Sequence, residues 1–194
     1  MIFSLNYIRA NVSGAWAVMN GQSEGLGRLD LSIEGFWRSF GVIILILPLI
    51  VIAMFGERSI VAHVQAEVPP LTGGRIAYNL AVIVFDWLAF PTVFAVLARV
   101  LGLSHRYGRF IIARNWATLV TAAIATPVYL LHLAGVLPPT VVPLVLLIVL
   151  GVSLRFAYLI ARIALDVPVS LALPIVLVDF LLSILIQGLL GSGG

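Results

Sequence analysis

The stretch GVIILILPLIVIAMF, residues 41–55, decides the fold because it contains no charged side chain. A helix needs about 20 mostly apolar residues to cross roughly 30 Å of hydrocarbon. The preceding residues from 36 onward supply the missing length, and a proline inside a membrane helix, here Pro48, kinks the helix without breaking it. The sequence therefore predicts a membrane-spanning helix over about 36–55, ended by the polar triplet at 56–58.

The composition of the whole chain agrees with a membrane protein. Of its 194 residues, 62% are hydrophobic and 10% are charged, and the mean hydropathy is +1.17. A soluble domain is about half apolar and a quarter charged, and a chain this small has too little interior to hide such an excess. Because there is no cysteine, disulfides, thiolate zinc sites and iron–sulfur clusters are excluded.

Four further spans are expected after the first. The second covers about 77–103 and is followed by a polar turn at 104–109, and the third covers about 110–136. No charged residue occurs between Asn115 and Leu154, a length suited to two helices, so the prolines at 138 and 139 mark the turn between them. The fourth span covers about 141–165 and the fifth about 169–190.

The two ends of the chain differ in composition from the spans. Residues 1–35 mix aromatic and polar side chains, which predicts a cytoplasmic amphipathic helix lying in the membrane interface. Residues 191–194 are expected to be a flexible tail. The fold class is thus an all-α, polytopic membrane bundle with two parts, 1–35 and a five-helix domain over 36–190.

Every basic side chain other than histidine is arginine, and the arginines are unevenly placed along the alternating spans. Arg58 and Arg75 fall at one face of the membrane, while most of the others fall at the opposite face. Because cytoplasmic loops carry the excess of basic residues, the N-terminus is expected inside and the C-terminus outside. The segment LDLSIEGFWRSF, at 29–40, resembles the entry segment of small bacterial inner-membrane proteins, and this resemblance implies the inner membrane of a bacterium. Interfacial anchors of this arrangement are predicted at Trp16, Trp37, Arg38, Arg106, Arg109 and Arg114.

Three charged residues are not explained by orientation. Asp86 and Asp179 each lie about ten residues inside a predicted span, where an ionised carboxylate costs about 2.5–3.5 kcal/mol on insertion scales. Arg155, in the fourth span, is the cation expected to pair with them at a similar depth. Tyr158 shares a helical face with Arg155, and Ser183 follows Asp179 at i+4 spacing. Arg114 is expected to lie one turn inside its helix and to reach back to the cytoplasmic surface.

The buried cluster has two interpretations. Polar contacts between membrane helices often serve only to fix which helices meet. Ionisable groups inside a membrane also line the pathways of ions and protons. The first interpretation predicts a scaffold or accessory subunit, and the second predicts a small transporter that uses Asp86, Arg155 and Asp179.

Other functional classes find less support in the sequence. No HExxH, GxSxG or paired-aspartate phosphotransfer motif is present, so a non-catalytic protein without cofactor is expected. Topology separates His105 from His63 and His132, which excludes a metal site shared by all three, and no metal is expected. The net charge is +3, but the basic residues form no stripe in a soluble segment, so nucleic acid is not an expected partner. The expected partners are the bilayer, anionic lipid headgroups and further membrane subunits or copies.

Five spans, a short N-terminal segment and an outward C-terminus resemble the Yip1 family of small membrane proteins. The resemblance is architectural and covers roughly 36–190, with FDWLAFP at 85–91 as a loose counterpart of a family motif. It implies a non-catalytic, partner-binding membrane protein and transfers no functional residue to this chain.

Overall fold

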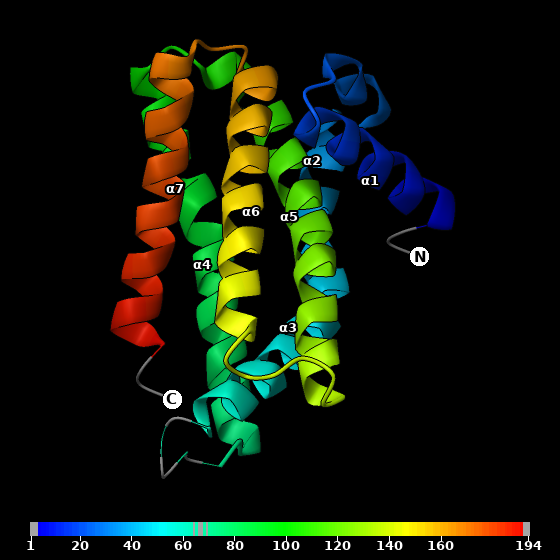
Figure 1. Ribbon diagram of the computed structural model, residues 1–194. Coiled ribbons are helices and arrows are strands. Elements are labelled where there is room, and N and C mark those ends of the chain that lie inside the picture. Colours follow the sequence, from blue (N-terminus) through cyan, green and yellow to red (C-terminus); the bar gives the residue numbers. More distant parts are fainter. Residues whose placement is uncertain (1–3, 64, 66–67, 69, 192–194) are drawn as a thin grey trace.

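The structure is a computed structural model that describes residues 4–63, 65, 68 and 70–191 (Figure 1). The described chain is helical: α1 (Leu5–Met19), a short 3-10 helix η1 (Ser23–Arg28), α2 (Ile33–Phe40), α3 (Val42–Val61), α4 (Gly73–Val100), α5 (Ser104–Leu133), α6 (Val142–Leu165) and α7 (Val169–Leu190). Five apolar helical segments in it are long enough to cross a membrane, with α2 and α3 together forming the first, Ile33–Val61. The prediction of an all-α membrane bundle is confirmed.

Three of the helices begin where a hydroxyl side chain can accept a bond from a free backbone N–H. Ser4 accepts from Tyr7 N, Ser32 from Gly35 N, and Thr72 from Arg75 N. Such caps satisfy donors that have no partner within the helix. They place the starts of α1, α2 and α4.

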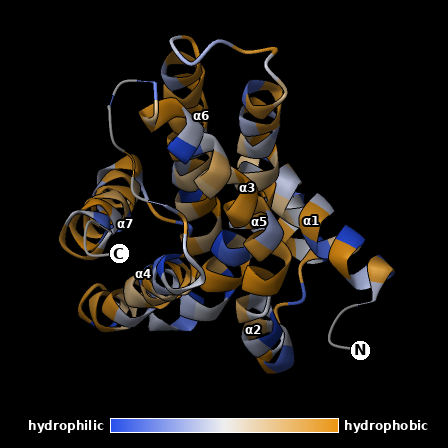
Figure 2. Cartoon of the chain, turned by 90° about the horizontal axis from the view of Figure 1, so that it is seen from below, coloured by the Kyte–Doolittle hydropathy of each residue, from blue (hydrophilic) through white to orange (hydrophobic). Residues whose placement is uncertain are grey.

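Helix α5 is the centre of the bundle. In its most apolar window 39% of the residues are buried, against 17% for α6, and it packs against α1, α2, α3, α4 and α6. The outward sides of the helices are largely hydrophobic (Figure 2), as expected for helices whose surroundings are lipid tails. The side chains that point inward from α5 therefore decide what the interior can hold.

The N-terminal helix α1 belongs to the same core. Ala15 and Val18 are fully buried, and the ring of Tyr7 meets that of Trp116 on α5 edge-on at 5.9 Å. A methyl group at Gly25 would lie 2.6 Å from the carbonyl oxygen of Gly14, so glycine is needed where η1 folds back on α1. The core thus continues across the predicted division at residue 35, and contact of α1 with the membrane surface stays a prediction.

Two predicted helix ends were wrong. The polar residues at 56–58 do not end the first span, because Glu57 accepts a bond from Tyr129 and Arg58 donates to the carbonyl of Val68, so α3 continues to Val61. The residues at 104–109 form the first turns of α5, not a turn between helices. The true break lies just before them, at Gly102, which has a φ of +71°.

Arginines at the start of α5 hold the turn between α6 and α7. Arg106 donates to the carbonyls of Leu165 and Asp166 and pairs with the Asp166 carboxylate at 2.9 Å, and Arg109 donates to the carbonyl of Ala164. These are carbonyls at the end of α6 that lack a helical partner. Asp166 itself has a left-handed backbone, with a φ of 51°. The two predicted anchors therefore have a structural role that the sequence did not indicate.

Three more of the predicted anchors, Trp16, Trp37 and Arg38, lie on the outside of the same end of the bundle, whereas Arg114 lies inside it. The exposed fractions of Trp16 and Trp37 are 48% and 69%. Arg38 pairs with Glu34 and lies over the ring of Tyr7, 5.3 Å from its centroid. Their contact with lipid headgroups stays a prediction.

Candidate functional site

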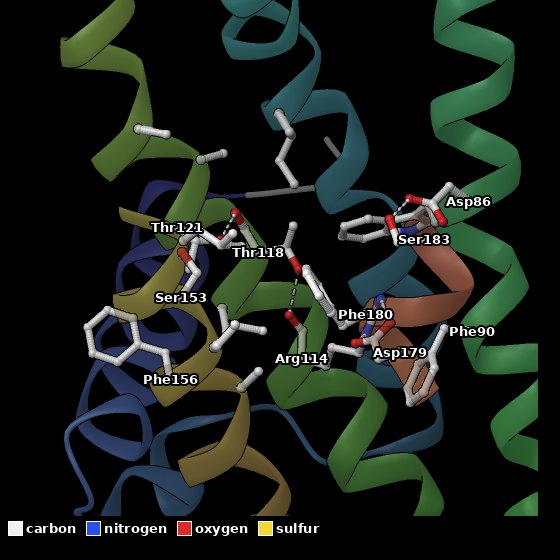
Figure 3. Close-up of a pocket in the computed structure, with 18 of the residues that line it drawn as sticks. Asp86, Phe90, Arg114, Thr118, Thr121, Ser153, Phe156, Asp179, Phe180 and Ser183 are labelled. Carbon is white, nitrogen blue, oxygen red and sulfur yellow. Dashed lines mark hydrogen bonds and ion pairs between the residues drawn. The ribbon is translucent and has the colours of Figure 1, made fainter. Parts of the chain in front are cut away.

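A cavity of about 590 Å³ lies among the membrane helices and is lined by residues of α3, α4, α5, α6 and α7. One face of α5 makes room for it, because a series of small side chains recurs there at helical spacing. These residues are Ala117, Thr118, Thr121, Ala122 and Ala125. Most of the wall is apolar, and its charged groups come from α4, α5 and α7 (Figure 3).

Arg114 of α5 and Asp179 of α7 form a two-point ion pair in the cavity wall. The Nε atom of Arg114 donates to Oδ2 of Asp179 at 3.0 Å, and Nη2 donates to Oδ1 at 2.8 Å. The guanidinium also lies 4.8 Å from the ring centroid of Phe90. Both residues are ten positions into their helices, about 15 Å from the same end of the bundle at 1.5 Å per residue.

Asp86 of α4 is held by a different residue of α7. Its Oδ2 accepts a hydrogen bond of 2.8 Å from the hydroxyl of Ser183, above the Arg114–Asp179 pair in Figure 3. Counted from the same end of the bundle, each residue of this second pair is fourteen positions along its helix, about 21 Å deep. The two polar contacts therefore occupy successive levels in the middle of the membrane span.

The charges in this wall do not cancel. Asp86 and Asp179 are the acidic groups, and Arg114 is the sole basic side chain among the described residues that line the cavity. When both carboxylates are ionised the cavity carries one negative charge in excess. Because an uncompensated charge inside a membrane is expensive, the neutral state requires a bound proton or a monovalent cation.

Hydroxyl groups in the same wall can accept hydrogen bonds. Thr118, Thr121 and Ser153 each donate their hydroxyl hydrogen to a carbonyl of their own helix, at 2.8–3.0 Å. This bond uses the donor and leaves oxygen lone pairs free. The cavity thus offers carboxylate and hydroxyl oxygens, which are ligands that suit cations.

The structure places part of the predicted cluster at one cavity but gives Asp179 a different cation. Asp86, Asp179 and Ser183 line one cavity, but the partner of Asp179 is Arg114. Arg155 is exposed and lies over the ring of Phe156. Arg114 was placed too near the surface because the start of α5 was set six residues too late. Tyr158 does not line the cavity; its ring packs against the core of the bundle.

A second polar group, at the opposite end of the bundle from α1, was not predicted as a unit. Tyr129, which lines the cavity, donates to Glu57 at 3.1 Å, and His132 contacts the Ser59 hydroxyl and the Leu137 carbonyl. His132, in the last turn of α5, is thus a hydrogen-bonded histidine at a helix end. Within the described residues no group of three or more histidine or acidic side chains is arranged to hold a metal.

Comparison with protein-family models, with curated proteins and with solved structures gave no match to this chain. The resemblance to the Yip1 family therefore stays a prediction. Function has to be argued from the cavity and its charges.

Proposed function

We propose that this membrane protein carries a proton or a small monovalent cation across the bilayer, with the Asp86 carboxylate as its binding group. The observation that carries the proposal is the excess of one carboxylate over guanidinium in a cavity at mid-membrane depth. Binding of a single positive charge makes the cavity neutral, and its release to the other side restores the starting state. A charge that must be compensated but is not permanently paired suits transport.

The two carboxylates have different roles in this proposal. Both oxygens of Asp179 accept from Arg114, so its charge is paired with a guanidinium. Asp86 accepts from Ser183, a neutral hydroxyl. Asp86 is therefore the exchangeable site, Ser183 orients it, and the Arg114–Asp179 pair fixes α5 and α7 beside it.

A scaffold or accessory subunit is the competing role. The same contacts join separate helices, α5 to α7 and α4 to α7, and such contacts can serve helix association alone. In that case Asp86 would contribute to assembly of the helices, and the protein would carry no ion flux. A transport measurement on a variant that still assembles distinguishes the two roles.

The test uses the purified chain in liposomes that contain a pH-sensitive dye or a Na⁺- or K⁺-sensitive dye. We expect the wild-type chain to raise proton or cation flux above that of empty liposomes, and D86N to remove the increase. D166N is the matched control, because Asp166 is an exposed carboxylate outside the cavity. D179N is unsuitable because it leaves the Arg114 guanidinium without its partner.

Two results would overturn the transport proposal. One is a wild-type chain that conducts no more than empty liposomes. The other is a D86N variant that assembles and conducts like the wild type. Either result with intact assembly would favour the scaffold, whose membrane partner would then be sought by co-purification from native membranes.

We also propose a location in a bacterial inner membrane with the α1 end in the cytoplasm. Arg106, Arg109 and Arg162 lie at the same end of the bundle as α1, whereas Arg58 and Arg75 lie at the opposite end. This distribution supports that orientation. A reporter that is active only in the cytoplasm, fused after residue 194, should be inactive; activity would reverse the proposed topology.

A further inference from the structure

A second cavity, of about 370 Å³, lies at the α1 end of the bundle and has the opposite charge character. Its described wall consists of Ser23, Arg109, Arg162, Ile163 and Asp166. The wall joins η1, the start of α5 and the end of α6. It is separate from the first cavity, which contains Asp86 and Asp179, since the two share no lining residue.

The positive charges of this wall exceed the negative charge. Asp166 is paired with Arg106, at 2.9 Å, so this one carboxylate stands against three arginines, Arg106, Arg109 and Arg162, and two positive charges remain in excess. The backbone carbonyl of Arg162 accepts from Val167 N, but its guanidinium forms no hydrogen bond or ion pair with any described residue. Glu24, beside Ser23 in the chain, is exposed and is not part of the described wall. Two positive charges therefore face one small space.

The guanidinium of Arg109 is held in place before any ligand binds. Its Nε donates to the carbonyl of Ala164, which holds the guanidinium plane at the end of α6 and leaves its two terminal nitrogens for another acceptor. Arg162 comes from the last turn of α6, and Ser23 of η1 adds a hydroxyl. Guanidinium groups bind phosphate through paired hydrogen bonds, and a group fixed before binding loses less entropy on binding.

We infer that this second cavity binds a phosphate monoester, held by Arg109, Arg162 and Ser23. A phosphate monoester carries about −1.5 to −2 charges at neutral pH, which matches the two uncompensated guanidinium groups better than the single charge of a diester. The phosphate belongs either to a lipid headgroup, such as phosphatidic acid, or to a soluble metabolite. Arg109 and Arg162 lie within about two turns of their helix ends, a depth that arginine can share with lipid phosphates. This inference does not depend on transport by the first cavity.

The test is calorimetric titration of the purified chain in a neutral detergent with four probes. These are dihexanoyl phosphatidic acid, dihexanoyl phosphatidylglycerol, glycerol 3-phosphate and inorganic phosphate. We expect one phosphate monoester per chain to bind more tightly than phosphatidylglycerol. If phosphatidic acid binds and the two soluble probes do not, the cavity is a lipid site. If glycerol 3-phosphate or inorganic phosphate binds as tightly as phosphatidic acid, the ligand is a soluble phosphate.

The deciding variant is R162Q, because Arg162 has no partner to lose within the described structure and the fold should be unaffected. Loss of one charged hydrogen-bond donor should weaken binding of the best probe by about tenfold or more. R99Q is the control, because it removes the same charge from an exposed arginine at the same end of the bundle. S23A, which removes a single hydroxyl, should weaken binding less than R162Q.

Three outcomes would overturn the inference. R162Q could bind every probe as well as the wild type does. R99Q could weaken binding as much as R162Q, which would show attraction by overall charge alone. Phosphatidylglycerol could bind as tightly as phosphatidic acid, which would refute selection of a monoester.

Discussion

Arg114 and Asp179 meet through two hydrogen bonds although 65 residues separate them in the chain. Only 18% and 24% of their side-chain surfaces are exposed. Removing one partner of a buried ion pair leaves a charge without compensation and costs about 3–5 kcal/mol, whereas replacing both by apolar groups is often neutral. The pair should therefore behave as a unit.

We expect D179L to lower the free energy of unfolding by about 3–5 kcal/mol, measured by chemical denaturation in detergent. The double variant R114M/D179L should recover most of this loss, because no charge is left unpaired. R155M is the matched control and should change stability little, since Arg155 is exposed. A D179L variant as stable as the wild type would refute the role assigned to this pair.

Gly56 should not accept even one methyl group. A Cβ there would lie 2.5 Å from Cδ1 of Tyr129, whereas a Cβ at Gly151 of α6 would meet nothing within 4 Å. Overpacking of this kind typically costs about 1–3 kcal/mol. G56A should thus lower the thermal unfolding temperature, while G151A should leave it unchanged or raise it, because alanine favours helix by up to about 1 kcal/mol. Equal behaviour of the two variants would show that α3 and α5 can separate without cost.

Replacing Arg106 should destabilise the protein more than replacing its partner Asp166. It donates to two carbonyls at the end of α6 as well as pairing with Asp166, and Asp166 is largely exposed. We expect R106Q to reduce stability by about 1.5–3 kcal/mol and D166N by less than about 1 kcal/mol. Asparagine also tolerates the left-handed backbone at this position. If D166N were the more damaging variant, the ion pair and not the carbonyls would hold the turn.

Tyr7 provides a pH-dependent attachment of α1. Burial, together with the hydrogen bond to Asp30, raises the pKa of Tyr7 to about 12, above the value of about 10 in unfolded chains. Because the folded pKa is raised, this stabilisation is complete below about pH 10 and is lost as the pH rises through 12. The emission of Trp116, which contacts the Tyr7 ring, should change over that range. Y7F keeps the ring and should lack this step; an identical step in Y7F would assign it to another group.

The sequence predicted the depth of the two aspartates and of Arg155 but placed Arg114 too near the surface, and it did not show which way either arginine points. Arg114 and Arg155 are each ten residues from the α1 end of their helices, so both lie about 15 Å deep, level with Asp179. Depth could therefore not choose between them. The choice depends on how α5 and α6 are rotated about their axes, which is set by packing of mostly uniform apolar faces and leaves little trace in a single sequence.

The helix ends were predictable where apolar runs stop at glycine or proline and less so where polar residues find partners. Pro138 and Pro139 separate α5 from α6 as expected. Glu57 was interpreted as a stop, but its carboxylate is bound by Tyr129. Tertiary hydrogen bonds of this kind join distant residues, so local composition does not indicate them.

The separation of Arg114 from Asp179 also constrains the order of events during synthesis. Helix α5 is made before α7, so its guanidinium is without its carboxylate while α6 and the turn after it are still being added. An unpaired arginine at the centre of a membrane helix costs about 2.5–3.5 kcal/mol on insertion scales. We therefore expect α5 to remain beside the insertion machinery, or in contact with water, until α7 arrives, and the last three helices to enter the lipid together.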